Sequence, residues 1–232
     1  MTNLLPSTER GHVNFGWLNS HHSFSFGDYY NPERMGFRSL RVINEDRIEG
    51  GTGFPTHPHR DMEIISYVIK GALEHQDSMG NKTRILPGEV QRMSAGTGIR
   101  HSEYNASPEE EAHFLQIWIL PDKQGYEPSY GQKSFAEELE KNSMVMVVSP
   151  SGEKGSISIH QDVRLWISRM KKGQKETLVL LPGRHNWIQM VKGQITVNGQ
   201  DLKTSDGLAL SGEKDLSFQA SEDSEFLVFD LA

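Results

Sequence analysis

The sequence predicts an all-β protein with two antiparallel β-barrel domains stacked face to face. Three observations support this prediction: short apolar or β-branched runs lie between Gly, Pro, Asn and Asp clusters, only one segment has a helix signature, and one block of sequence is repeated. Many short strands with turn residues between them are typical of sandwiches and barrels. With 232 residues, the chain is long enough for two compact domains.

The expected strands follow one another from the first third of the chain to its end. They cover residues 38–43, 64–69, 113–120, 144–148, 156–160, 188–191, 194–197 and 225–229. The helix begins after Ser134, which forms a capping box with Glu137, and it ends at Asn142. Residues 121–131 are polar and rich in turn formers, as expected of a linker. We therefore expect an N-terminal domain over 1–120, a linker with the short helix over 121–142, and a C-terminal domain over 143–232.

A repeat relates the two halves. The segment VIKGAL at 68–73 matches MVKGQI at 190–195, and Gly80 and Gly199 follow as turn residues. In each half a further glycine comes eight residues later. A strand, turn, strand order that occurs twice predicts a duplicated antiparallel unit.

Composition excludes several functions. The formal net charge is −7 and no basic cluster is present, which argues against nucleic-acid binding. The longest apolar runs have about five residues, far fewer than a membrane span needs, and no signal peptide is evident, so we expect a cytoplasmic protein. The chain has no cysteine, which excludes disulfides and thiolate chemistry. Any metal must therefore be bound by nitrogen and oxygen ligands.

Two pairs of residues have the spacing of metal ligands. His57 and His59 are two residues apart, and so are His101 and Glu103. In a strand, residues two apart point to the same face. If the two strands face each other, three imidazoles and a carboxylate converge, a set that suits a divalent transition metal.

The surroundings of these pairs resemble the two motifs of the cupin barrel, in which a glycine precedes His-x-His by six residues and a glycine turn leads to a distal histidine. Further stretches resemble the pirin family: GWL at 16–18, HSFSFGDYY at 22–30, MGFRSLRVIN at 35–44, THPHRDMEI at 56–64, HQDSMGN at 75–81 and MSAGTGIRHSE at 93–103. Within that family the chain is most similar to bacterial pirin-like quercetin 2,3-dioxygenases.

The resemblance implies one divalent metal bound by His57, His59, His101 and Glu103. Iron is the metal we expect, with manganese, nickel, cobalt, copper or zinc as alternatives. It also implies a bicupin fold and an oxidoreductase that cleaves flavonols such as quercetin with dioxygen and releases carbon monoxide. The partners would be a planar aromatic small molecule and dioxygen, and we expect a monomer. Two other functional hypotheses remain open: a metal- or redox-sensing regulatory protein, and a non-oxidative cupin isomerase or lyase.

Other residues carry weaker expectations. Glu103 and Glu63 are the candidates for proton transfer, and by its parity with His57 and His59 Glu63 would point inward with them. The other histidines are expected to be hydrogen-bonded or exposed. In the C-terminal half, Val179, Leu181 and the region of Phe218 stand where the metal ligands would be, which predicts an apolar core there.

Overall fold

The computed structural model describes residues 1–232 and is nearly all-β, which confirms that part of the predicted fold. Its strands are β1 (Thr2–Leu5), β2 (Gly11–Asn14), β3 (Leu18–His22), β4 (Leu40–Ile48), β5 (Gly53–His59), β6 (Glu63–Lys70), β7 (Leu73–Asp77), β8 (Lys82–Ile85), β9 (Glu89–Ser94), β10 (Ile99–Asn105), β11 (Ala112–Ile119), β12 (Ser129–Ser134), β13 (Met144–Ser149), β14 (Ile157–Ser158), β15 (Val163–Met170), β16 (Lys175–Val179), β17 (His185–Lys192), β18 (Gln194–Val197), β19 (Gln200–Lys203), β20 (Gly207–Ser211), β21 (Asp215–Ala220) and β22 (Ser224–Leu231). The helix α1 (Ala136–Lys141) lies where the capping box predicts it, and it is far too short to cross a membrane. Short 3-10 turns occupy Ser7–Glu9 and Glu153–Gly155.

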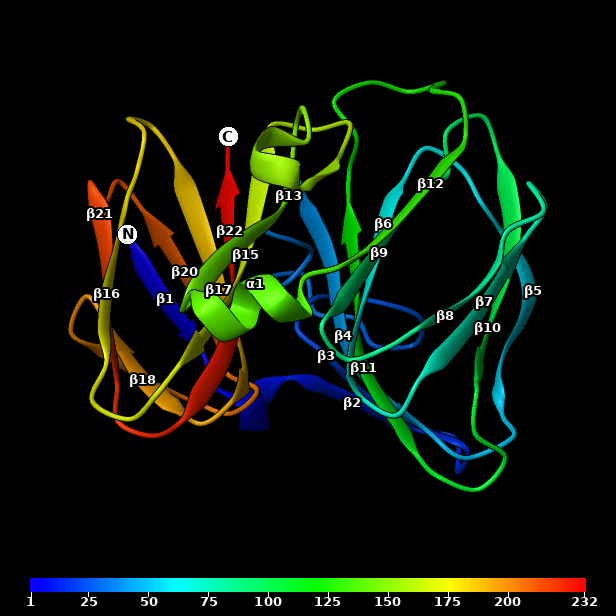
Figure 1. Cartoon of the computed structure of the whole chain (residues 1–232), viewed down its shortest axis with the longest axis horizontal. Helices are drawn as coiled ribbons and strands as arrows, with labels where there is room; N and C mark the ends of the chain where they lie inside the picture. Colours follow the sequence, from blue (N-terminus) through cyan, green and yellow to red (C-terminus); the bar gives the residue numbers. More distant parts are fainter. The chain divides into compact units, whose positions relative to one another are not determined.

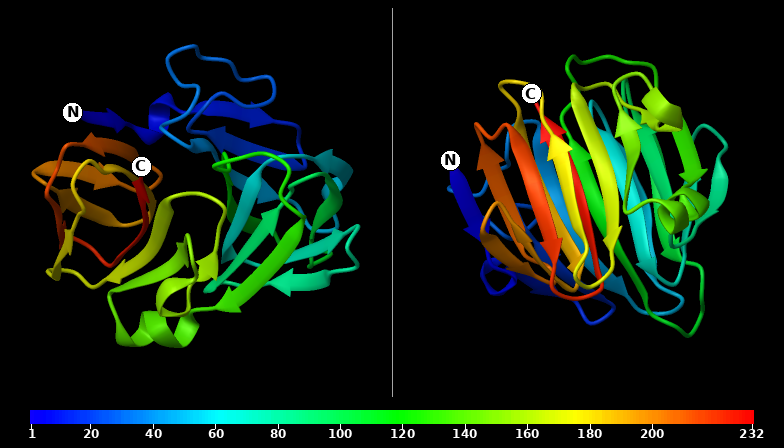
Figure 2. Two further views of the ribbon diagram at one scale, coloured as in Figure 1. Left: turned by 90° about the horizontal axis from the view of Figure 1, so that it is seen from above. Right: turned by 60° about the vertical axis from the view of Figure 1, so that its left-hand side comes forward.

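The chain divides into two compact units that are interleaved in sequence. The N-terminal unit comprises residues 11–136 and 159–161, and the C-terminal unit comprises residues 1–10, 137–158 and 162–232. The first ten residues belong to the C-terminal unit because β1 pairs with β20, as the blue and orange strands of Figures 1 and 2 show. Likewise, β12 extends the N-terminal unit by pairing with β9, although its residues were expected in the linker.

The two units repeat one sheet topology. The N-terminal unit has a seven-stranded sheet, β12-β9-β6-β11-β4-β3-β2, and a four-stranded sheet, β5-β10-β7-β8. In the C-terminal unit the orders are β1-β20-β17-β22-β15-β13-β14 and β16-β21-β18-β19, so that β4 to β11 correspond in turn to β15 to β22. Gly71 and Gly193, matched in the sequence repeat, both have the positive φ that their turns require. The repeat therefore corresponds to a duplicated unit, while closure of the sheets into barrels stays a prediction.

The interiors of the two units differ in polarity. In the N-terminal unit, Ser66 of β6 donates a hydrogen bond to Glu103 of β10, so the facing sheets meet there through polar groups. In the C-terminal unit, β16 and β21 take the places of β5 and β10 and contribute Leu178, Leu216 and Phe218 to an apolar core. The predicted apolar core is confirmed there.

Two residues expected in that core lie elsewhere. Val179 and Leu181 are 80% and 58% exposed, while Leu180 between them packs inward. Counting back from the repeated glycine failed because it assumed equal loop lengths in the two units.

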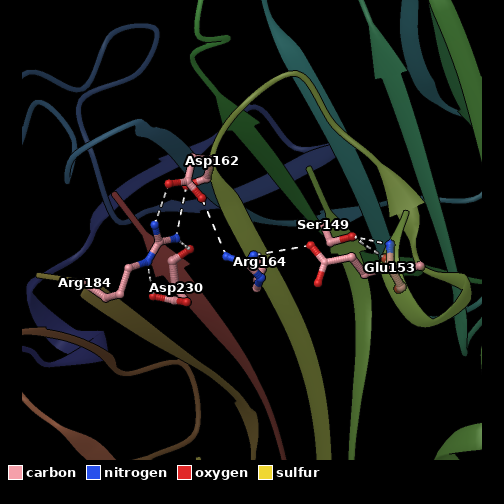
Figure 3. Close-up of polar contacts among 7 residues, drawn as sticks. Ser149, Glu153, Asp162, Arg164, Arg184 and Asp230 are labelled. Carbon is pink, nitrogen blue, oxygen red and sulfur yellow. Dashed lines mark hydrogen bonds and ion pairs between the residues drawn. The ribbon is translucent and has the colours of Figure 1, made fainter. Parts of the chain in front are cut away.

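A network of ion pairs lies at one end of the C-terminal sheet, and one of its pairs is buried. Arg184 pairs with Asp230 and Asp162, and Arg164 connects Asp162 to Glu153 (Figure 3). The side chains of Arg184 and Asp230 are almost completely buried, at 7% and 5% exposed. Buried charges are tolerated only when they are paired, so this pair has a structural function.

Candidate metal centre

The candidate ligands come from two adjacent antiparallel strands. In the four-stranded sheet of the N-terminal unit, β10 pairs with β5, and His101 lies directly opposite His57. Alternation along β5 puts His59 on the same face as His57. The pairing thus brings two distant segments of sequence together on neighbouring strands of one sheet, and not on strands that face each other.

The three imidazoles form a compact cluster. One ring nitrogen each of His57, His59 and His101 lies within 4.8 Å of the other two. The ring centroids are 4.5 Å apart for His57 and His101, 4.7 Å for His57 and His59, and 4.8 Å for His59 and His101. Movements of side chains alone could bring these nitrogens around one ion.

Hydrogen bonding leaves lone pairs in this cluster. His57 Nδ1 lies 2.8 Å from the carbonyl oxygen of Pro55, which can only accept, so that Nδ1 carries the hydrogen and Nε2 has the lone pair. His101 Nε2 is buried and has no hydrogen-bond partner. A buried imidazole nitrogen without a partner, beside two other imidazoles, is the donor that a metal ion requires.

The surroundings of His59 and His101 keep these two imidazoles neutral. Burial, followed by the charges of His101 and His57, lowers the pKa of His59 to about 4. Burial, with the neighbouring His57 and His75, lowers the pKa of His101 to about 3. Both rings are therefore unprotonated at neutral pH, which is the form that binds metals.

Glu103 is held close to this cluster by neutral donors. It is buried, and one of its carboxylate oxygens lies within 4.8 Å of ring nitrogens of His101 and His75. Ser66 Oγ donates to Glu103 Oε1 at 3.0 Å, and Gln116 Nε2 donates to Oε2 at 2.6 Å. The carboxylate therefore has a fixed orientation.

Glu63 is on the other face of its sheet. It accepts hydrogen bonds from Ser94 Oγ at 2.9 Å and from His160 Nδ1 at 3.1 Å, whereas Ser66, three residues on, faces Glu103. The parity argument failed because β5 ends at His59 and the chain turns at Asp61, where φ is 48°, before β6 begins. The alternation of β5 does not continue into β6.

Aromatic rings adjoin the cluster. The Trp118 ring contacts His59 edge to face at a centroid distance of 4.9 Å, and Phe26 contacts Trp118 in the same way at 5.2 Å. Phe26 is thus the member of the N-terminal aromatic run that comes near the site, while Phe24 is buried and Tyr30 is exposed. These two rings, which are perpendicular to each other, place apolar surface beside the imidazoles.

Sequence reasoning missed three residues around the site. His75 is completely buried and contacts His101, and its cross-strand position opposite Glu103 depends on a register that spacing does not reveal. Gln116 is a polar residue within a strand of mostly apolar residues, β11, and this contrast was the signal that could have found it. His160 bonds Glu63 from a distant segment, while His113 pairs with Glu45, as expected of a hydrogen-bonded histidine.

Family comparisons cover almost the whole chain. Residues 6–119 match the family model described as Pirin, and residues 146–231 match the one described as quercetinase C-terminal cupin domain. Quercetin 2,3-dioxygenase from Escherichia coli K12 is 51% identical over 231 residues, covering 100% of this chain and 99% of that protein. The putative quercetin 2,3-dioxygenase of Pasteurella multocida is 48% identical, with 96% of each chain covered.

Solved structures agree with these matches. The crystal structure of YhhW from Escherichia coli superposes with a TM-score of 0.96 at 50% identity, covering 100% of this chain and 98% of that one. The nickel(II) complex of the bacterial pirin YhhW gives a TM-score of 0.95 at 51% identity, with coverage of 100% and 99%.

Proposed function

Because this chain belongs to the pirin family, we propose that it is a metal-dependent dioxygenase that cleaves flavonols such as quercetin. The observation that carries the proposal is the cluster of three imidazoles beside an oriented carboxylate. The Escherichia coli protein that is 51% identical to this chain is named quercetin 2,3-dioxygenase, and this supports the substrate class.

The proposed ligands of one divalent metal are His57, His59, His101 and Glu103. The donor set fits a transition ion, since neutral imidazole and carboxylate suit iron, nickel and manganese. The family resemblance favours iron, and nickel gains support from the nickel(II) complex of YhhW. A cytoplasmic location and a monomeric state remain predictions.

In the proposed reaction, a metal bound to these ligands would polarise the substrate enolate and permit its reaction with dioxygen. Glu103 accepts the proton of the flavonol 3-hydroxyl, and the hydrogen bonds from Ser66 and Gln116 hold its carboxylate in one orientation. Trp118 supports the planar ring system from the side of His59. Both atoms of dioxygen enter the organic product and one ring carbon leaves as carbon monoxide, so the overall reaction is balanced.

Oxygen uptake joined to elemental analysis tests this function. The purified chain, loaded in turn with iron, nickel, manganese, cobalt or copper, is expected to hold about one metal per chain and to consume oxygen when quercetin is added. His101→Ala is expected to lose both metal and activity while keeping its far-ultraviolet circular dichroism. His185→Ala, at a histidine of the C-terminal unit that bonds Ser211, is the matched control. No oxygen uptake with any flavonol and any metal would refute the dioxygenase, and would favour a regulatory or non-oxidative role.

A further inference from the structure

His75 connects a proposed metal ligand to a buried carboxylate. It lies on β7, where the register puts Glu103 opposite His75 and His101 opposite Asp77. His75 Nδ1 is 3.5 Å from Nδ1 of His101, and His75 Nε2 is 3.2 Å from Oδ2 of Asp77. All three side chains are buried, so bulk water does not supply alternative partners.

Asp77 acts as a pure acceptor. Burial alone would raise its pKa, but hydrogen bonds from Asn81, His75 and Met79 lower it below its usual range. Its Oδ1 accepts from the backbone N–H groups of Met79 and Asn81, and its Oδ2 accepts from Asn81 Nδ2 at 2.8 Å. An ionised carboxylate has no hydrogen to donate.

The positions of the ring hydrogens follow from this acceptor. His75 Nε2 must carry a hydrogen in order to bond Asp77, so in neutral His75 the Nδ1 atom has the lone pair. His101 Nδ1 must then carry the hydrogen that lies between the two rings. The lone pair of His101 is left on Nε2, the atom that is buried without a partner.

We infer that His75 and Asp77 are positioning residues that fix the tautomer of His101, so that its Nε2 lone pair faces the proposed metal. The inference rests on the metal site of the proposed function. Partners outside the coordination sphere commonly fix histidine ligands in this way. Here the carboxylate acts through a second imidazole.

His75 could instead be a ligand itself, because it also forms a close group with His101 and Glu103. The hydrogen bonds argue against this. Its Nε2 carries the hydrogen that bonds Asp77, and the lone pair of its Nδ1 accepts the N–H of His101. Neither nitrogen of His75 therefore has a lone pair left for an ion.

Two substitutions separate tautomer control from simple packing. In Asp77→Asn, the amide oxygen keeps the two backbone bonds of Oδ1, and the NH₂ group faces both His75 Nε2 and the Asn81 amide, which turns over so that its oxygen accepts. That donor reverses the hydrogen positions of both rings and puts a hydrogen on His101 Nε2. In His75→Asn, the side-chain oxygen takes the place of Nδ1 and still accepts from His101. Glu45→Gln is the matched control, since Glu45 also pairs with a buried histidine, His113.

Two measurements on the full chain test the effect of these substitutions on the His101 tautomer and on metal binding. Nitrogen-15 shifts of histidine in the metal-free protein report the tautomer, and titration with nickel(II) alone reports affinity. We expect Asp77→Asn to protonate His101 Nε2 and to weaken nickel binding by roughly 10- to 100-fold. His75→Asn and Glu45→Gln should keep the wild-type affinity.

The opposite order of nickel affinities among these variants would overturn the inference. If Asp77→Asn kept both the tautomer and the nickel affinity, the relay would not exist. If His75→Asn lost nickel while the Asp77→Asn protein bound it normally, His75 would be a ligand. Neither measurement involves flavonol or oxygen, so an inactive wild-type enzyme would refute the proposed function without affecting this result.

Discussion

Gln116 of β11 donates a 2.6 Å hydrogen bond to Glu103 Oε2 of β10. Ser66, which is paired with Gln116 across β6 and β11, contacts both the other carboxylate oxygen and the Gln116 side-chain oxygen. The two facing sheets of the N-terminal unit are thus connected through the carboxylate that we propose as a ligand. Its orientation depends on a residue that binds no metal.

Gln116→Leu is therefore expected to weaken nickel(II) binding by about tenfold. Leucine removes one donor and leaves Glu103 less well oriented in a buried site, although the side-chain volume is similar. Calorimetric titration of the metal-free protein measures the change. Gln189→Leu, at a fully buried glutamine of the C-terminal unit, is the control. Equal affinities for the Gln116 variant and the wild type would show that Glu103 needs no such support.

Glu63→Gln tests the second candidate for proton transfer. The Glu63 carboxylate bonds Ser94 and His160, and His160 stacks on Tyr126 with 3.7 Å between ring centroids. We expect unchanged nickel affinity and turnover, with a loss of about 1 to 2 kcal/mol in the free energy of unfolding because charge-assisted hydrogen bonds are weakened. Urea unfolding and oxygen uptake measure the two effects. A fully metallated variant with slow turnover would instead identify Glu63 as a base.

The sequence predicted the parts of the site that depend on alternation within one strand. His57 with His59, and the glycine turns of the repeat, need only local geometry. The position of Glu63 could not be predicted because a turn at Asp61 resets the alternation. The role of His75 depends on β7 lying beside β10 in one particular register, and such non-local pairing is not encoded in spacing.

Arg184→Met is expected to destabilise the protein by about 3 kcal/mol, because it leaves Asp230 buried without its partner. Arg184 Nε lies 2.8 Å from Asp230 Oδ1 (Figure 3). Arg164→Met is the matched control, since Arg164 is more exposed and its bridges to Asp162 and Glu153 are longer, so a cost of less than about 1 kcal/mol is expected. Urea unfolding measures both variants. Equal losses in the free energy of unfolding would mean that burial of the Arg184–Asp230 pair does not increase its contribution to stability.

Tyr130 makes stability depend on pH in alkaline solution. Its hydroxyl bonds Thr83 Oγ1 at 2.6 Å and Gln132 Oε1 at 2.7 Å. Burial, with the charges of Asp77, Glu89 and Glu103, raises the pKa of Tyr130 to about 12, although the bond with Thr83 opposes this. In the unfolded chain a tyrosine ionises near pH 10.

The sign of the effect follows from proton binding. Between pH 10 and pH 12 the unfolded chain loses this proton while the folded protein keeps it, so the free energy of unfolding falls as pH rises. The contribution is complete below about pH 10 and is lost as pH passes through about 12. Tyr130→Phe cannot ionise, so its stability should fall less steeply, and the difference from wild type should shrink from pH 9 to pH 11.5 in urea unfolding followed by tryptophan fluorescence. Tyr30→Phe, at an exposed tyrosine, should show a constant difference. A constant difference for Tyr130→Phe as well would mean that burial does not hold the proton on Tyr130.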